Sequence, residues 1–130
     1  MCLLDEVVHW NEVRISCRIG GHRDPNNPLR AAGRLGVVCG IEYAAQTMAV
    51  HGALSHGAGS PAAGFLAAVR NVQMLIDRLD DVAGALICDA VRAAGDHVTA
   101  LYDFELRSST VCLLRGRATV VLQGNAESKP

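Results

Sequence analysis

The segment from about Leu35 to Leu54 constrains the fold most, because it has helical length and almost no polar face. Its sequence, LGVVCGIEYAAQTMAVHGAL, contains a single carboxylate, Glu42. A helix that is apolar nearly all round must be covered by other elements on most of its sides. The rest of the chain must therefore supply a surface that wraps around this helix.

The other segments with regular apolar spacing predict strands. Residues 12–19, EVRISCRI, alternate between apolar and polar side chains, which is the pattern of a half-buried strand. Residues 65–77, FLAAVRNVQMLID, are long enough for a strand with a bend. Residues 85–123 predict three more strands separated by turns at AAGD and RSS. Strands joined by such short turns pair antiparallel.

The predicted order is one strand, a loop rich in Gly, Pro and Asn, one apolar helix and a run of strands. A curved antiparallel sheet wrapped about the helix is the most economical way to cover it. We therefore predict an α+β protein with the hotdog arrangement, as a single domain over residues 1–130. The polar tail of residues 124–130 is expected to be disordered.

Composition excludes several classes of protein. The net charge is −1 with no basic cluster, which argues against a nucleic-acid partner or a membrane-surface protein. No apolar run approaches the roughly 18 residues of a membrane span, and acids stand where a signal peptide has basic residues, so we expect a cytoplasmic protein. The five cysteines are widely spaced without a CxxC pair, which favours buried reduced thiols over disulfides or a metal site.

One helix face combines polar and apolar side chains around the carboxylate. Glu42 and Gln46 are four residues apart and share that face with Val38, Ala45 and Ala49. A carboxylate among apolar side chains is costly to ionise, so its pKa should rise, and a raised pKa suits a general acid. The alternative is that Glu42 lies at a mouth of the sheet, solvated or paired with an arginine.

His22 lies in the segment GGHRDPNNPL, directly after the first predicted strand. The glycines and prolines there fix an irregular backbone, and a histidine can act as a base at neutral pH. The alternative is an ordinary surface histidine. Taken together, His22 and Glu42 form a candidate acid–base pair.

These same segments resemble a known family. GHRDPNNPL followed by GIEYAAQ is similar to the bacterial 3-hydroxyacyl-acyl carrier protein dehydratases of the hotdog fold, which have GHFPGxPxxPG and then a buried helix with ExxAQ. HRDPNNPLRAAGRLGVVCGIEYAAQ resembles the pattern HxDNPxR…GRLP…GIEYxAQ of the predicted 3-hydroxyacyl-acyl carrier protein dehydratase subgroup. The resemblance continues through LLDEV, NEVRISCRI, GFLAAVRNVQM and LLRGRATVVL, so it covers about residues 3–122.

The resemblance implies roles for individual residues. His22 would take the α-proton of a 3-hydroxyacyl thioester, and Glu42 of a partner subunit would protonate or orient the leaving hydroxyl. Gln46 would position Glu42 or line the pocket. Backbone N–H groups at the helix N-terminus would bind the thioester oxygen as its negative charge grows. These donors are Gly36, Val37, Val38 and Cys39.

The resemblance also implies the reaction and its partners. The product would be a trans-2-enoyl thioester, in fatty-acid or polyene-type biosynthesis, with the substrate carried on the phosphopantetheine of acyl carrier protein. No metal or cofactor is implied, because a thioester already acidifies its α-carbon. We expect a homodimer or a higher oligomer of dimers, or a heterodimer with another hotdog protein.

Departures from the family pattern keep two alternatives open. The family's short PxxPG link is replaced by a longer one, with no PG, and GRLG replaces GRLP. The first alternative is that the chain is a catalytically degenerate hotdog subunit, which binds acyl chains or pairs with an active dehydratase. The other alternative is an acyl-thioesterase with a helix carboxylate, although such enzymes typically need no loop histidine.

Other charged residues near His22 and Glu42 can be explained without a catalytic role. Arg23, Arg30 and Arg34 surround His22 and could meet the acidic carrier protein or its phosphate, but solvated loop arginines are the simpler interpretation. Asp80 and Asp81 are interpreted as turn residues.

Overall fold

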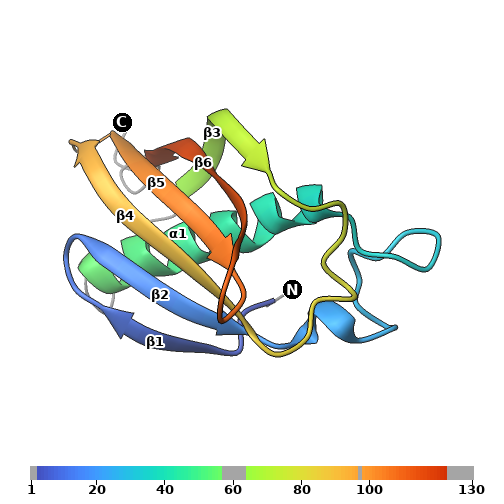
Figure 1. Cartoon of the computed structure of the whole chain (residues 1–130). Helices are drawn as coiled ribbons and strands as arrows, with labels where there is room; N and C mark the ends of the chain where they lie inside the picture. Colours follow the sequence, from blue (N-terminus) through green and yellow to red (C-terminus); the bar gives the residue numbers. More distant parts are fainter. Residues whose placement is uncertain (1–2, 57–63, 97, 123–130) are drawn as a thin grey trace.

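The computed structural model describes residues 3–56, 64–96 and 98–122 and is shown in Figure 1. In chain order the elements are β1 (Glu6–Trp10), β2 (Arg14–Ile19), α1 (Gly40–His56), β3 (Gly64–Met74), β4 (Leu86–Gly95), β5 (Thr99–Arg107) and β6 (Cys112–Leu122). Two 3₁₀ turns, Gly21–Arg23 and Val37–Cys39, lie between β2 and α1.

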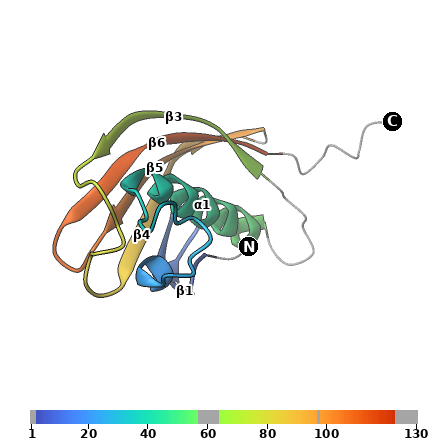
Figure 2. The ribbon, with the colours of Figure 1, turned by 90° about the vertical axis from the view of Figure 1, so that its right-hand side faces the viewer.

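The strands form one antiparallel sheet in the order β1-β2-β4-β5-β6-β3. Figure 2 shows this sheet curving around α1, which lies in its concave side. This is the hotdog arrangement that the sequence predicts. Within the described residues, no helix combines the length and apolar character that crossing a bilayer requires.

The predicted alternation is confirmed by the side chains that the sheet buries against α1. Burial of these groups removes apolar surface from water, which is the main force that holds the sheet on the helix. They come from four strands: Ile15, Cys17 and Ile19 from β2, Leu86, Cys88 and Ala90 from β4, Tyr102, Phe104 and Leu106 from β5, and Leu114, Ala118 and Val120 from β6.

Helix α1 begins at Gly40, five residues later than predicted, because residues 37–39 form a 3₁₀ turn first. A Cβ atom at Gly40 would lie 2.6 Å from Leu114 Cδ2 and 2.8 Å from Leu106 Cδ2. Both leucines are fully buried. The helix can therefore approach the sheet closely at this point only because residue 40 has no side chain.

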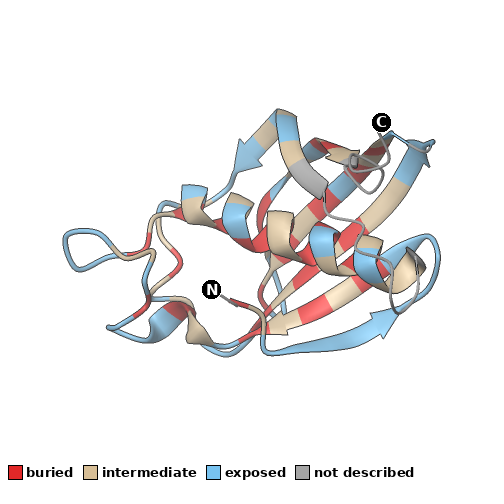
Figure 3. Ribbon diagram, turned by 180° about the vertical axis from the view of Figure 1, so that it is seen from behind, coloured by how far each residue is buried: buried red, intermediate tan, exposed pale blue. Residues whose placement is uncertain are grey.

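The expectation that α1 is covered on most sides is wrong for a single chain. The sheet curves around one side of the helix, and Figure 3 shows exposed bands along the side that faces away from it. Glu42, Ala49 and Ala53 are exposed there, as is Val38 just before the helix. The apolar composition of this face thus has no explanation within one copy of the chain.

Strand β1 was not predicted, because none of its five residues is buried. An edge strand without a buried face gives no alternating pattern. It pairs with β2 through a register shift between Val7 and His9. Strand β2 starts at Arg14 rather than residue 12, because the Asn11 side chain accepts the backbone N–H groups of Val13 and Arg14 in the preceding turn.

The predicted bend in β3 is confirmed. Asn71 has a φ of 55°, and the pairing with β6 shifts register between Arg70 and Gln73. The strand ends at Met74 rather than Asp77, and the chain then passes the N-terminal end of α1. The tail of residues 124–130 lies outside the described residues.

The described residues contain four cysteines with free thiols, Cys17, Cys39, Cys88 and Cys112, and Cys2 lies outside the described residues. The prediction of buried reduced thiols is confirmed for Cys17 and Cys88. Cys17 and Cys88 are buried and stand opposite each other on β2 and β4. Burial raises the pKa of the Cys88 thiol to about 12, so it stays protonated and unreactive. The other two thiols are half-buried.

Candidate active site

His22 occupies the centre of the 3₁₀ turn that follows β2, and its side chain is buried, with 1% of its surface exposed. This excludes the alternative of a surface histidine. Its Nε2 atom lies 2.9 Å from the carbonyl oxygen of Val82, in the connection between β3 and β4.

That hydrogen bond determines which ring nitrogen of His22 is basic. A carbonyl oxygen only accepts, so the neutral ring carries its proton on Nε2 and donates it to Val82. The Nδ1 atom then has a lone pair, and it is the one buried side-chain nitrogen or oxygen without a partner in the described part of the chain. A buried imidazole with a fixed tautomer and an unused lone pair can accept a proton from a bound substrate.

Arg30 holds the loop around His22 together from inside. Its guanidinium donates to the carbonyl oxygens of Asp24, Arg23 and Gly33 at 2.9, 3.0 and 3.0 Å. It also lies 3.8 Å from a carboxylate oxygen of Asp80. The interpretation of Arg30 as a solvated arginine is therefore wrong, because its hydrogen bonds fix the shape of the loop.

Asp80 joins this loop to the segment that carries the Val82 carbonyl. Its carboxylate accepts the N–H of Leu35 at 2.9 Å and pairs with Arg78. The hydrogen bond from Arg78 and then that from Leu35 hold the pKa of Asp80 well below its usual range, so it is ionised at every physiological pH. Asp80 therefore does more than shape a turn, and sequence reasoning missed this role because two of its partners, Leu35 and Arg30, are distant in the chain.

The predicted backbone donors near the helix N-terminus are not equivalent. The N–H of Val37 donates to Asp77 at 3.0 Å, and that of Cys39 donates to Gly36 at 3.0 Å. Among the described residues, no hydrogen bond is recorded for the N–H of Gly36 or Val38. The N–H groups of Gly36 and Val38 are therefore the two that could bind the thioester oxygen, and this role stays a prediction.

Glu42 lies in the first turn of α1 on the exposed side. The expected apolar burial of its carboxylate is not present in a single chain, because the sheet lies on the other side of the helix. In the described part of the chain, Glu42 forms no hydrogen bond or ion pair with His22. Any pairing of the two would have to come from a second chain.

Gln46, one turn after Glu42, holds the N-terminal segment. Its Oε1 atom accepts the backbone N–H of Leu3 at 2.8 Å, and the Leu3 side chain is buried in the core. The sequence did not predict this contact, because it joins residues 43 positions apart.

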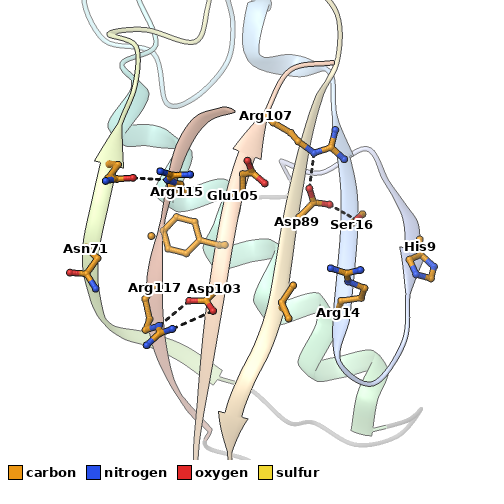
Figure 4. A pocket seen from close by; sticks show the side chains of 14 residues that line it. His9, Arg14, Ser16, Asn71, Asp89, Asp103, Glu105, Arg107, Arg115 and Arg117 are labelled. Atoms are coloured by element: carbon orange, nitrogen blue, oxygen red, sulfur yellow. Dashed lines mark hydrogen bonds and ion pairs between the residues drawn. The ribbon is translucent and has the colours of Figure 1, made fainter. Parts of the chain in front are cut away.

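A groove of about 790 Å³ lies on the sheet face away from α1, as Figure 4 shows. Four of its charged groups form two ion pairs. Arg107 and Ser16 both donate to Asp89, and Arg117 donates to Asp103. The groove is on the opposite side of the sheet from α1 and contains none of the predicted catalytic residues. The described residues also contain no group of three or more His, Cys, Asp or Glu placed to hold a metal ion.

Solved structures of other proteins share this architecture. A chain of the dehydratase heterocomplex ApeI:P from Xenorhabdus doucetiae superposes with a TM-score of 0.79 at 21% identity, covering 98% of this chain and 86% of that chain. Thioesterase HI1161 from Haemophilus influenzae gives a TM-score of 0.67 at 14% identity, covering 90% and 76%. A mutant of thioesterase SAV0944 from Staphylococcus aureus gives 0.68 at 12% identity, covering 90% and 91%. The chain is therefore a hotdog-fold protein.

The family follows from the sequence itself. Residues 1–129 match the family model described as ApeP-like, ApeP dehydratase. The chain belongs to the ApeP-like dehydratase family. No curated protein sequence matches it significantly.

Proposed function

We propose that the protein removes water from a 3-hydroxyacyl group on acyl carrier protein and forms the trans-2-enoyl thioester. One observation supports this proposal most: His22 is buried, donates from Nε2 to Val82 and keeps a lone pair on Nδ1 that has no partner among the described residues. Such a group suits the removal of an α-proton, which is the first requirement of dehydration next to a thioester.

Two protein side chains, His22 and Glu42, account for both proton transfers of the proposed reaction. His22 Nδ1 takes the α-proton, and the electron pair moves to the thioester oxygen. The carbonyl then reforms, a double bond forms between the α- and β-carbons, and the bond from the β-carbon to the hydroxyl breaks. Glu42 gives the proton that makes this hydroxyl leave as water. One proton transfer from His22 back to Glu42 resets the pair, and the N–H groups of Gly36 and Val38 would bind the thioester oxygen.

We propose that Glu42 reaches the His22 of a second chain. Two features support association. The exposed side of α1, together with Val38 just before it, is mostly apolar, and Val38 is 54% exposed. Strand β3 lies at an edge of the sheet that the described residues form. The partner is a second copy or another hotdog subunit. The likeness to a dehydratase heterocomplex supports the second arrangement.

The sequence resemblance supports acyl carrier protein as the substrate carrier and a biosynthetic pathway as the context of the reaction. Arg23 and Arg34 are exposed on the His22 loop, where they could meet the phosphate of phosphopantetheine or the acidic carrier protein. A role in fatty-acid or polyene-type biosynthesis and a cytoplasmic location remain predictions from the sequence. So does the absence of a metal or cofactor.

The test is enoyl hydration and 3-hydroxyacyl dehydration on loaded acyl carrier protein, with the protein alone and with a co-expressed hotdog partner. His22→Ala and Glu42→Gln should each lose about 100-fold or more in kcat, the range typical of general acid–base groups. His9→Ala is the control, because His9 is exposed in the β1 edge strand. Wild-type turnover in both catalytic variants would contradict the proposal.

Thioester hydrolysis is the second candidate, because two of the similar structures are thioesterases and Glu42 is a helix carboxylate. Release of free thiol from acyl thioesters, measured beside enoyl hydration, separates the two reactions. Hydrolysis that survives in His22→Ala would favour the thioesterase. Neither reaction alone, but dehydration with a hotdog partner, would favour a subunit that acts only in a heterocomplex.

A further inference from the structure

Asn27 is a buried residue in an otherwise exposed part of the His22 loop. Its exposed fraction is 8%, whereas its neighbours Asn26 and Pro28 are exposed. A buried amide is costly unless its polar atoms are hydrogen-bonded. The bonds that Asn27 makes therefore explain why it is buried.

Both ends of the Asn27 side chain are used. The Nδ2 group donates to the carbonyl oxygen of Gly21 at 2.9 Å and to the hydroxyl of Tyr43 at 3.2 Å. The Oδ1 atom accepts the N–H of Leu29 at 2.8 Å. A planar amide holds its two N–H groups in fixed directions. The distance between the Gly21 carbonyl and the Tyr43 hydroxyl is thus set by one rigid group.

These two partners flank the proposed catalytic residues in the sequence. Gly21 immediately precedes His22, and Tyr43 immediately follows Glu42. Tyr43 is fully buried in the core, and this burial raises the pKa of its hydroxyl, which stays neutral and accepts the Asn27 N–H. Asn27 therefore ties the turn that carries the base to a fixed point on the helix that carries the acid.

The backbone just before His22 is intrinsically flexible. Two glycines, Gly20 and Gly21, stand immediately before His22, and glycine restricts the backbone least of all residues. A Cβ atom at Gly21 would meet nothing within 4 Å, so packing does not hold this residue either. Arg30 holds the carbonyl of Arg23, on the C-terminal side of His22. The Asn27 amide holds the carbonyl of Gly21, on its N-terminal side, which also accepts the N–H of Asp24 within the turn.

We propose that Asn27 is the positioning residue that fixes the direction of His22 Nδ1, by joining the carbonyl of Gly21 to the hydroxyl of Tyr43. The proposal rests on the role proposed for His22. Asn27 touches neither substrate nor reacting atoms in this scheme. It acts through the position of His22.

Asn27→Asp tests this directly, because the variant keeps the shape and the acceptor for Leu29 but loses both N–H donors. We expect kcat to fall by about 100-fold with KM changed less than about 3-fold, since a misplacement of about 1 Å costs that much. Asn26→Asp is the matched control, with the same chemical change at an exposed neighbour, and should keep wild-type kcat. Tyr43→Phe removes one of the two anchors and should give an intermediate loss.

A readout independent of activity is the ¹⁵N spectrum of the His22 imidazole, assigned from the signals lost in His22→Gln. The wild type and Asn26→Asp should show the single tautomer protonated on Nε2, and Asn27→Asp should show a mixture or broadened signals. Circular dichroism shows whether Asn27→Asp folds. If it does not, kcat and the ¹⁵N spectrum of His22 in Tyr43→Phe test the proposal instead.

Two results would overturn the inference: a kcat for Asn27→Asp equal to that of Asn26→Asp, or an unchanged His22 spectrum. If the wild type itself has no dehydratase activity, alone or with a partner, the proposed function fails. The spectra then still report whether Asn27 holds His22 in position.

Discussion

His22 and His51 are both buried histidines, but their hydrogen bonds give them different properties. His22 keeps one ring nitrogen without a partner in the described part of the chain. Both nitrogens of His51 are bonded: Nε2 donates to the Asn11 carbonyl at 2.8 Å, and Nδ1 accepts from the Tyr102 hydroxyl at 2.7 Å. At the scale of single residues, one imidazole is left available for chemistry and the other fixes the β1–β2 turn to α1.

The His51 contacts predict a pH dependence of stability. Burial, and the positive charge of Arg92, lower the pKa of His51 below its ordinary value of about 6.5, partly offset by the bond to Asn11. The unfolded state therefore binds this proton more strongly, so the free energy of unfolding falls as pH drops below about 6.5. In urea titrations from pH 7 to pH 5, His51→Gln should lose part of this decline. His9→Gln, at an exposed site, should retain it, and identical slopes in both variants would refute the assignment.

At the scale of elements, the two glycines of α1 have opposite roles. Gly40 faces buried leucines at the start of the helix, whereas a Cβ at Gly52 would meet nothing within 4 Å. Alanine is the better helix former by about 1 kcal/mol. That preference acts at both positions, but only Gly40 also has a steric reason to remain glycine.

Gly40→Ala and Gly52→Ala should therefore change stability in opposite directions. Overpacking a dense core costs about 1–3 kcal/mol, which outweighs the helix preference at Gly40 and predicts a net loss of about 1 kcal/mol. Gly52→Ala should raise the free energy of unfolding by about 0.5–1 kcal/mol. Equal shifts of the two variants in thermal or urea unfolding would show that α1 does not approach the sheet this closely.

At the scale of the whole molecule, the single chain is incomplete in two respects. The sheet leaves one side of α1 exposed, as Figure 3 shows. Glu42, the candidate acid, is exposed and forms no hydrogen bond or ion pair with His22 in the described part of the chain. A second chain against α1 would cover the apolar side and bring in a second Glu42. The same association would thus serve burial and catalysis.

Ala49→Arg tests this association, because Ala49 is exposed on α1 two turns after Glu42. We expect the variant to have a smaller mass by light scattering, and to lose dehydration in parallel, since a charge is disfavoured in an apolar interface. Val8→Arg is the control: Val8 is exposed on β1, the sheet edge opposite β3. An unchanged mass for Ala49→Arg, or equal loss in both variants, would place the interface elsewhere.

Much of the fold is predictable from local pattern. Alternation in residues 12–19 and 85–123 marks strands that bury one face, and the apolar segment before Leu54 marks the central helix. The same logic explains the failures. β1 buries no residue and so leaves no alternation, and the 3₁₀ turn before Gly40 is apolar like the helix that follows it.

The sequence by itself determined the central helix, the strands that bury one face, the antiparallel hotdog arrangement and the choice of His22 and Glu42 as candidates, since these depend on side-chain spacing and on short motifs. Only the tertiary structure decided that Nδ1 of His22 has no partner among the described residues, that Asn27 joins its turn to Tyr43, and that Glu42 faces outward. The reason is physical: each depends on contacts between segments that meet only after the chain has folded. Val82 lies 60 residues from His22, and no local pattern records which carbonyl a buried imidazole will find.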